Sequence, residues 1–146
     1  MRVRAARRDD FDGVTRLLEA LGRPAVTEAT EADARAIYEQ QIVQPDTHHI
    51  VIEDRDGAVV AFASMHFRGR LNQVSEEAWI PDLIVDERAR RQGLGRMLLD
   101  EAERRARERG CHALTLESGY QRAEAHHMYR QFRMRDVAKA FYKPLR

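Results

Sequence analysis

An apolar segment, a basic turn punctuated by glycines and the start of a helix follow one another over residues 83–99. The apolar segment is Leu83, Ile84 and Val85, and the turn is Arg90, Arg91, Gln92, Gly93, Leu94, Gly95 and Arg96. The first N–H groups of a helix have no acceptor within it and lie at the positive end of its dipole. The glycines bring a ligand close to the backbone, and the arginines add positive charge. The sequence therefore predicts a phosphate site built largely from main-chain N–H groups.

The spacing of the glycines separates this turn from two other phosphate-binding loops. A dinucleotide fingerprint needs G-x-G-x-x-G and a P-loop needs G-x-x-x-x-G-K-[ST], and the sequence has neither. Its pattern, Arg90-x-x-Gly93-x-Gly95, resembles the R/Q-x-x-G-x-G/A loop that binds the pyrophosphate of acetyl-coenzyme A in the GNAT superfamily of N-acetyltransferases. On these residues alone, a plain strand-to-helix turn with solvated arginines is the alternative.

Two later segments extend the resemblance over most of the chain. Residues 122–129, Arg-Ala-Glu-Ala-His-His-Met-Tyr, resemble the superfamily's R-x-x-A-H-x-F-Y segment, and residues 141–145, Phe-Tyr-Lys-Pro-Leu, resemble its terminal strand. The order and lengths are most similar to the small-molecule members typified by the aminoalkylphosphonate N-acetyltransferases. Two positions depart from the pattern, because Arg133-Met134 stand where Gly-Phe is usual and Arg91 stands where a glycine is usual.

The resemblance implies a role for each of these residues. Acetyl-CoA would be the cosubstrate, with its pantetheine arm along residues 83–85 and with Arg122 and His126 near the coenzyme. Tyr129 would protonate the departing thiolate, because a phenol with a pKa near 10 keeps its proton at neutral pH. Asp82 and Glu77 are the candidates for accepting the proton of the amine, directly or through water.

The predicted function is therefore direct acetyl transfer, without an acyl-enzyme, from acetyl-CoA to a primary amine of a small molecule. Two alternatives stay open: a peptide or protein acceptor, and a non-catalytic module that senses coenzyme A. Adjacent histidines at 48–49 and 126–127 point in different directions on a strand or a helix, so no metal site is expected. The resemblance also implies a homodimer.

Length and composition favour a single domain over residues 1–146. Lysines and arginines number 25 and acidic residues 24, and this balance argues against a nucleic-acid partner. The single cysteine, Cys111, cannot form an internal disulfide, and no apolar run approaches the roughly 20 residues that span a bilayer. We expect a cytoplasmic protein that does not associate with membranes.

The elements that must position the site alternate between strands and helices. Asp56-Gly57 predicts a hairpin, residues 68–73 a loop, and the helix from residue 94 a crossover that makes strands 79–85 and 113–116 parallel. Residues 27–44 predict a helix with only a weak apolar face, either a lid on the substrate side or a marginal surface helix. The predicted fold is α/β (α+β) of the GNAT type. It has a mixed, mostly antiparallel twisted sheet of six to seven strands, a central splayed parallel pair and about four flanking helices.

Overall fold

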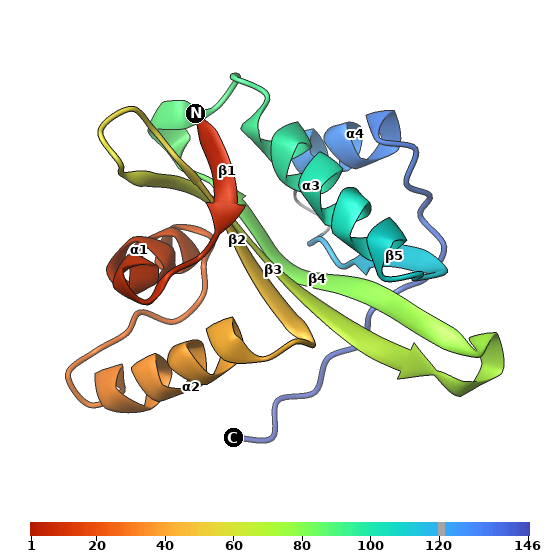
Figure 1. Ribbon diagram of the computed structural model, residues 1–146, viewed down its shortest axis with the longest axis horizontal. Coiled ribbons are helices and arrows are strands. Elements are labelled where there is room, and N and C mark those ends of the chain that lie inside the picture. The colour runs from red at the N-terminus through yellow and green to blue at the C-terminus, as the bar shows by residue number, and fades with distance from the viewer. Residues whose placement is uncertain (120–121) are drawn as a thin grey trace. The chain divides into compact units, whose positions relative to one another are not determined.

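The computed structural model describes residues 1–119 and 122–146 and divides them into two compact units, Met1–Leu116 and Glu117–Arg146. The first unit contains a sheet and helices α1 (Phe11–Ala20), α2 (Glu31–Val43) and α3 (Leu94–Glu108). The second unit contains helix α4 (Ala123–Gln131) (Figure 1).

Over the described residues the sheet has five strands in the order β1-β2-β3-β4-β5. They are β1 (Arg2–Ala5), β2 (Thr47–Glu53), β3 (Val59–Arg70), β4 (Ser75–Val85) and β5 (Ala113–Leu116). Neighbours are antiparallel except β4 and β5, which confirms that these two strands are parallel. The pair was predicted at the centre of the sheet, but among the described strands it lies at one end, because β5 is the last strand in the order. The predicted hairpin is also confirmed: the Asp54 carboxylate accepts the N–H groups of Asp56 and Ala58, and Gly57 takes the left-handed conformation that closes the turn.

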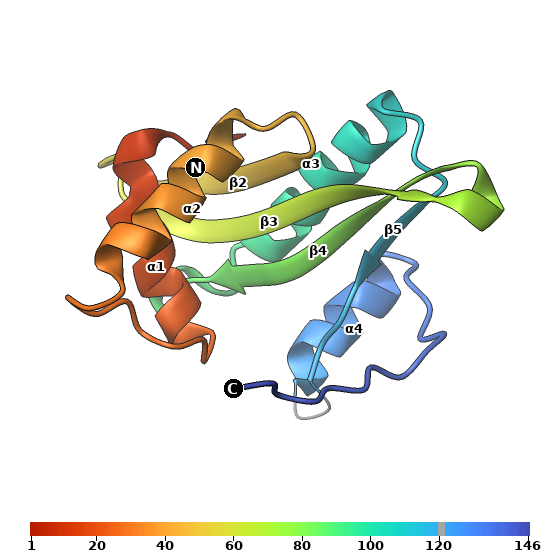
Figure 2. The same cartoon turned by 90° about the horizontal axis from the view of Figure 1, so that it is seen from below.

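Helices α1 and α2 lie against one face of the sheet and α3 against the other (Figures 1 and 2). The apolar residues of α1 recur at helical spacing, and Phe11, Val14 and Leu17 are buried in one cluster with Val51, Phe62 and Ile84 of the sheet. Helix α3 buries a second apolar stripe, which consists of Leu94, Leu98, Leu99, Ala102 and Ala106. Both faces of the sheet are therefore covered by helices.

Strands β3 and β4 are longer than the sequence predicted. The expected loop over residues 68–73 is wrong in its first part, because β3 continues to Arg70 before the short 3-10 turn Leu71–Gln73. Arg68 faces Glu77 across the ladder, and their side chains meet at 2.6 Å. The Arg68 guanidinium also lies 4.5 Å from the centre of the Trp79 ring. These cross-strand contacts extend the hairpin with polar residues, which the alternation of apolar residues does not reveal.

A bulge divides β4 into two parts. Ser64 faces Asp82 and His66 faces Trp79, so Ile80 and Pro81 together stand opposite Met65 alone. The pairing of β4 with β5 covers residues 77–80, whereas β4 itself continues to Val85. Residues 82–85 are thus paired with β3, and their other edge lies beyond the end of the parallel ladder.

In the second unit, residues 132–146 contain no helix or strand. The predicted total of six to seven strands is therefore not confirmed, and the described strands number five. Residues 141–145, which resemble the terminal strand of the superfamily, form no strand, and Phe141, Tyr142 and Leu145 among them are exposed. Without an apolar face against a neighbouring layer, alternation in sequence does not suffice to form a strand.

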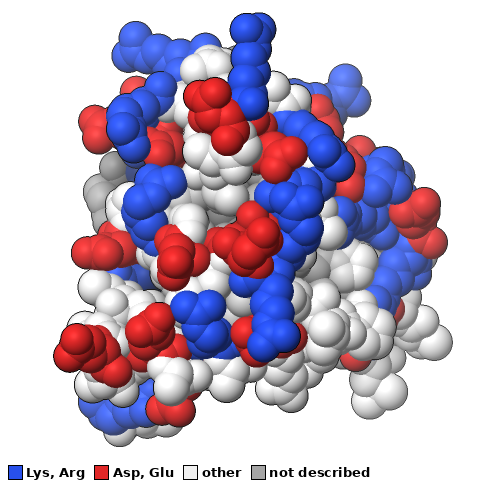
Figure 3. Space-filling view, turned by 60° about the vertical axis from the view of Figure 1, so that its left-hand side comes forward, with Lys and Arg blue, Asp and Glu red and all other residues white. Residues whose placement is uncertain are grey.

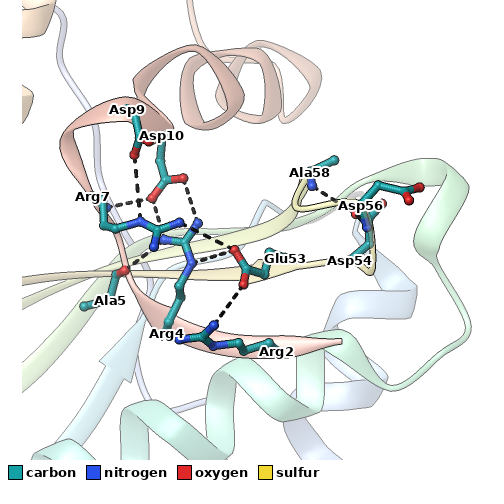
Figure 4. A network of polar contacts seen from close by, with 10 residues as sticks. All are labelled: Arg2, Arg4, Ala5, Arg7, Asp9, Asp10, Glu53, Asp54, Asp56 and Ala58. Carbon is teal, nitrogen blue, oxygen red and sulfur yellow. Dashed lines mark hydrogen bonds and ion pairs between the residues drawn. The ribbon is translucent and has the colours of Figure 1, made fainter.

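The start of the chain is tied down by a network of ion pairs (Figure 4). Arg4 on β1 donates to both carboxylate oxygens of Asp10, at 2.6 and 2.9 Å, and to Glu53 on β2 at 2.8 Å. The Arg7 N–H also donates to Asp10, at 2.6 Å. Basic and acidic side chains are interspersed over the face that Figure 3 presents, as the balanced composition leads one to expect.

Candidate active site: a basic loop, a strand edge and a cavity

The predicted phosphate loop connects β4 to α3. Asp86 caps the short 3-10 turn Glu87–Ala89 by accepting the Arg88 N–H, and the chain then turns through Arg90 to Gly93, the N-cap of α3. Gly93 has φ +76°, and a Cβ built there would meet nothing within 4 Å. Since its carbonyl accepts the Met97 N–H, the N–H groups of Leu94 and Gly95 lie in the first turn and have no acceptor within α3. The loop thus combines free donors with open space.

The arginines of the loop differ in their surroundings. Arg90 and Arg91 are exposed and form no ion pair with any described residue, whereas Arg96 donates to Asp100 at 3.1 Å. Arg91 has φ +63°, a left-handed conformation that costs a side-chain-bearing residue about 1–2 kcal/mol. This is the position where the family pattern has a glycine. The backbone has therefore kept the conformation that glycine favours, and the chain places a positive charge there.

The strand before the loop offers backbone groups at its outer edge. The Asp86 N–H donates to the Val60 carbonyl at 2.8 Å, so in this antiparallel ladder residues 84 and 82 also turn their backbone groups toward β3. The backbone groups of Leu83 and Val85 then point away from β3, beyond the residues that pair with β5. An extended ligand could pair with Leu83 and Val85, while the N–H and C=O of Ile84 face β3.

A cavity of about 300 Å³ lies on the α1 and α2 face of the sheet. Its lining is mostly apolar on the helices, apart from Thr15 and Gln41, and mostly polar on the strands, apart from Phe62. The lining residues are Phe11, Val14, Thr15, Leu18, Val26, Ala34, Ile37, Tyr38, Gln41, His49, Phe62, Ser64, His66 and Asp82. Of the candidate catalytic residues, Asp82 alone is among them.

Asp82 is held at the strand end of this cavity. Its Oδ1 accepts from Arg23 Nε at 2.8 Å, and its Oδ2 accepts from the Ser64 hydroxyl at 3.4 Å. Arg23 is half exposed and also donates to the Pro81 carbonyl at 3.1 Å. One carboxylate oxygen of Asp82 therefore has only a long hydrogen bond among the described residues and can accept another donor.

Two histidines in the cavity were not singled out by the sequence. Burial, more than any neighbouring charge, lowers the pKa of His49 to about 4 and also lowers the pKa of His66. His49 Nε2 lies 2.8 Å from Gln41 Oε1, so the proton is on Nε2, and Nδ1 is buried with no hydrogen-bond partner. Only the pairing of β2 with β3 brings His49 opposite Ser64, and local spacing does not reveal it.

Glu77 is placed differently from Asp82. It lies on the outer part of β4, is buried, and accepts from Arg68 at 2.6 Å and from Arg70 at 3.2 Å. Burial alone would raise its pKa, but the two guanidinium groups outweigh that effect and lower it. Glu77 does not line the cavity, so its contacts are those of a strand-pairing residue.

The remaining candidates lie in the second unit. His126 and Tyr129 are three residues apart on α4 and so share a face of that helix, and the Arg122 carbonyl accepts the His126 N–H at 3.0 Å. Tyr129 is half buried, and this burial raises the pKa of its phenol above the ordinary value of 10.0. The phenol is therefore a proton donor at neutral pH.

The described residues contain no group of three or more His, Cys, Asp or Glu that could hold a metal ion. The helices among them are all too short or too polar to cross a membrane.

The sequence is similar to those of known acetyltransferases. The model of the acetyltransferase (GNAT) family matches residues 14–133. Aminoalkylphosphonate N-acetyltransferase of Salmonella typhimurium is 28% identical over 130 residues, which cover 87% of this chain and 80% of that protein. The uncharacterized N-acetyltransferase YhdJ of Bacillus subtilis is 43% identical over 65 residues, 42% of this chain and 46% of that protein, so the match spans less than half of the relative.

Solved structures are similar over almost the whole chain. A transcriptional regulator from Bacillus halodurans superimposes with a TM-score of 0.91 at 23% identity, covering 99% of both chains. Glucosamine-6-phosphate N-acetyltransferase from Arabidopsis thaliana gives a TM-score of 0.85 at 22% identity, covering 99% of this chain and 98% of that one. At such identities the likeness establishes the fold.

Proposed function

Because this chain belongs to the acetyltransferase (GNAT) family and is thus an acyl-transferring enzyme, we propose that it acetylates a primary amine of a small molecule directly from acetyl-CoA. The observation that carries the proposal is the cavity of about 300 Å³ that reaches Asp82 on β4, the strand that leads into the basic loop. A cavity of this size is at the lower end of the range for small-molecule sites. We also propose that the two units act as one domain, since the family match crosses both.

The loop fits a diphosphate. The N–H groups of Leu94 and Gly95 are without acceptors in α3, and the space beside Gly93 is open. Arg90 and Arg91 have no competing ion pair among the described residues. Leu83 and Val85 would pair with the pantetheine arm. Arg122 and His126 keep the roles that the family pattern gives them, near the coenzyme.

The reaction needs an unprotonated amine and a proton for the leaving thiolate. In the proposed mechanism the acceptor ammonium loses its proton to Asp82, directly or through water, and the freed nitrogen attacks the thioester carbonyl. The C–S bond then breaks, and the thiolate takes the phenolic proton of Tyr129. The attacking nitrogen gives its second proton through solvent to the Tyr129 phenolate, which leaves a neutral amide. Asp82 releases the first proton to solvent and is ready for the next turnover. We assign proton acceptance to Asp82 over Glu77 because Glu77 is neutralised by two arginines.

Two measurements test this function. Calorimetry should detect binding of both CoA and acetyl-CoA, and thiol release should depend on an added amine. Tyr129→Phe should lower kcat about 100-fold and leave CoA affinity unchanged, because the phenol acts only as an acid. His127→Ala, an exposed neighbour on α4, is the matched control and should keep the wild-type rate. Absence of CoA binding would overturn the proposal, and turnover unaffected in Tyr129→Phe would remove the role of Tyr129.

A further inference from the structure

The apolar wall of the cavity comes from two helices at matching spacing. Helix α1 contributes Phe11, Val14 and Leu18, and α2 contributes Ala34, Ile37 and Tyr38, with Gln41 one turn further on. Positions i, i+3, i+4 and i+7 form one face of a helix, so the weak apolar face of α2 is the face that lines the cavity. Ile37 remains 56% exposed there, and its apolar surface is available to an occupant.

The polar end of the cavity, formed by Gln41, His49, Ser64, His66 and Asp82, carries no positive side chain. Its one charge is the Asp82 carboxylate, and His49 is neutral at physiological pH because its pKa lies near 4. One guanidinium contacts Asp82 at this end, that of Arg23, and it is already bound to Asp82 Oδ1 and to the Pro81 carbonyl. A phosphonate or carboxylate in the cavity would find no free cation among the residues that line it.

The buried Nδ1 of His49 also indicates which ligand groups the polar end of the cavity can bind. With the proton on Nε2, Nδ1 is a hydrogen-bond acceptor, and no described residue donates to it. A buried polar atom without a partner costs free energy, so native proteins satisfy such atoms with protein, water or ligand. An ammonium, directly or through a bound water, supplies donors, whereas an anion supplies none.

From this cavity we infer that the acceptor is an amine on an uncharged apolar body, such as an alkylamine or arylalkylamine, and that amines carrying an anionic group are rejected. The inference rests on the proposed function, whose acceptor class it narrows. A volume of about 300 Å³ corresponds to about ten non-hydrogen atoms when each takes the space of one water. The ammonium lies against Asp82 at the polar end, and the body lies between α1 and α2.

The test compares two amines by calorimetry on the wild-type protein, without acetyl-CoA. 2-Phenylethylamine, with an apolar body, should bind at least about tenfold more tightly than 2-aminoethylphosphonate, whose anionic group would be buried without a partner. 2-Phenylethanol, which keeps the body and loses the charge, should bind more weakly than the amine by about tenfold.

A substitution on the exposed part of the wall sharpens the test. Ile37→Arg places a cation on the cavity face of α2 and should shift the affinity ratio toward 2-aminoethylphosphonate by about tenfold. Ile37→Gln, polar but uncharged at the same position, should leave the ratio within about twofold. Both variants should fold, because Ile37 is more than half exposed.

The outcomes separate this inference from the function on which it rests. Equal or tighter binding of 2-aminoethylphosphonate to the wild-type protein would overturn the inference, and so would equal shifts in the two Ile37 variants or no binding of 2-phenylethylamine. Titration of the same samples with CoA reports on the proposed function independently. If CoA binds while the amine preference is absent, acetyl transfer stands and only the acceptor class fails.

Discussion

Two polar clusters lie on the same face of the sheet and differ in how completely their groups are paired. In the network of Arg4, Asp10 and Glu53, every guanidinium nitrogen donates and both Asp10 oxygens accept, all within 3.1 Å (Figure 4). In the polar end of the cavity, His49 Nδ1 has no partner and Asp82 Oδ2 has one bond of 3.4 Å. The first cluster, which we call the saturated network because all its groups are paired, connects β1 to β2 and to the start of α1. The polar end of the cavity has unpaired groups, so it can still form hydrogen bonds with a ligand.

The first prediction concerns a substitution of Arg4, the residue at the centre of the saturated network. Arg4→Met leaves the Asp10 and Glu53 carboxylates without their main partner, and breaking a buried pair in this way costs about 3–5 kcal/mol. Urea denaturation should show this loss in the free energy of unfolding, while calorimetry at a temperature where the variant is folded should show wild-type CoA affinity. Arg2→Met is the control, because its guanidinium is largely exposed and 3.5 Å from Glu53. Similar stabilities of the two variants would contradict the comparison.

The second prediction is that the two clusters lose their contributions to folding stability in different pH ranges. The folded protein holds the pKa of His49 near 4 against about 6.5 when unfolded, so the unfolded state binds the proton first as the pH falls. Stability should decline between pH 6.5 and 4 by roughly 3 kcal/mol from this group. His49→Phe, which keeps a ring between Tyr38 and Phe62, should flatten that decline.

Asp10 acts in a lower pH window. Burial alone would raise its pKa, but hydrogen bonds from Arg4 and from the Arg7 N–H hold it below the ordinary value of 3.8. Its contribution to stability is thus present above pH 3.8 and is lost as the pH falls further. Denaturation curves at closely spaced pH values should show two phases of loss, and a His49→Phe variant that retains the upper phase unchanged would be evidence against the assignment.

The third prediction concerns the cavity alone. Asp82→Asn should lower kcat/KM about 100-fold by removing the proton acceptor. Its effect on stability should stay within about 1 kcal/mol, since the partner Arg23 is half exposed and screened by solvent. Asp46→Asn, which changes another carboxylate paired with an arginine, serves as the control and should keep full activity. Steady-state kinetics and urea denaturation on both variants decide the point.

The smallest expected change in stability is for substitutions of Arg91, which has a strained backbone conformation in the basic loop. Arg91→Gly and Arg91→Ala both remove the charge, but only glycine relaxes the left-handed backbone. The free energy of unfolding of Arg91→Gly should therefore exceed that of Arg91→Ala by about 0.5–1 kcal/mol, once the entropic cost of ordering a glycine is subtracted. Both should weaken CoA binding equally and make it less dependent on salt. A higher stability of the alanine variant would mean that the conformation at residue 91 is different.

Local patterns in the sequence predicted those elements whose signals are local. The Asp56-Gly57 pair predicted the hairpin, and the basic turn predicted the start of α3. The cavity could not be predicted in this way. Its residues come from α1, α2, β2, β3 and β4, and the register of the sheet decides which of them face one another.

Adjacent histidines illustrate the limit. His48 and His49 alternate across β2, so His48 stacks edge-on with Phe67 and contacts Arg105 of α3, while His49 faces the cavity. The sequence pattern correctly predicted that the two rings point apart. It did not reveal that His49 would have an unpaired nitrogen and would line the same cavity as Asp82.

The bulge at Ile80 and Pro81 determines on which face of the sheet the Asp82 side chain projects. In a regular strand, residues three positions apart project from opposite faces, so Trp79 and Asp82 would be separated by the sheet. The inserted residue resets that alternation, and Trp79 stacks near His66 on the side where Asp82 also projects. Since proline has no N–H to leave unpaired, it suits the insertion. Deleting Pro81 would turn the carboxylate of residue 82 toward α3, so acid–base chemistry here depends on a single extra residue in the backbone.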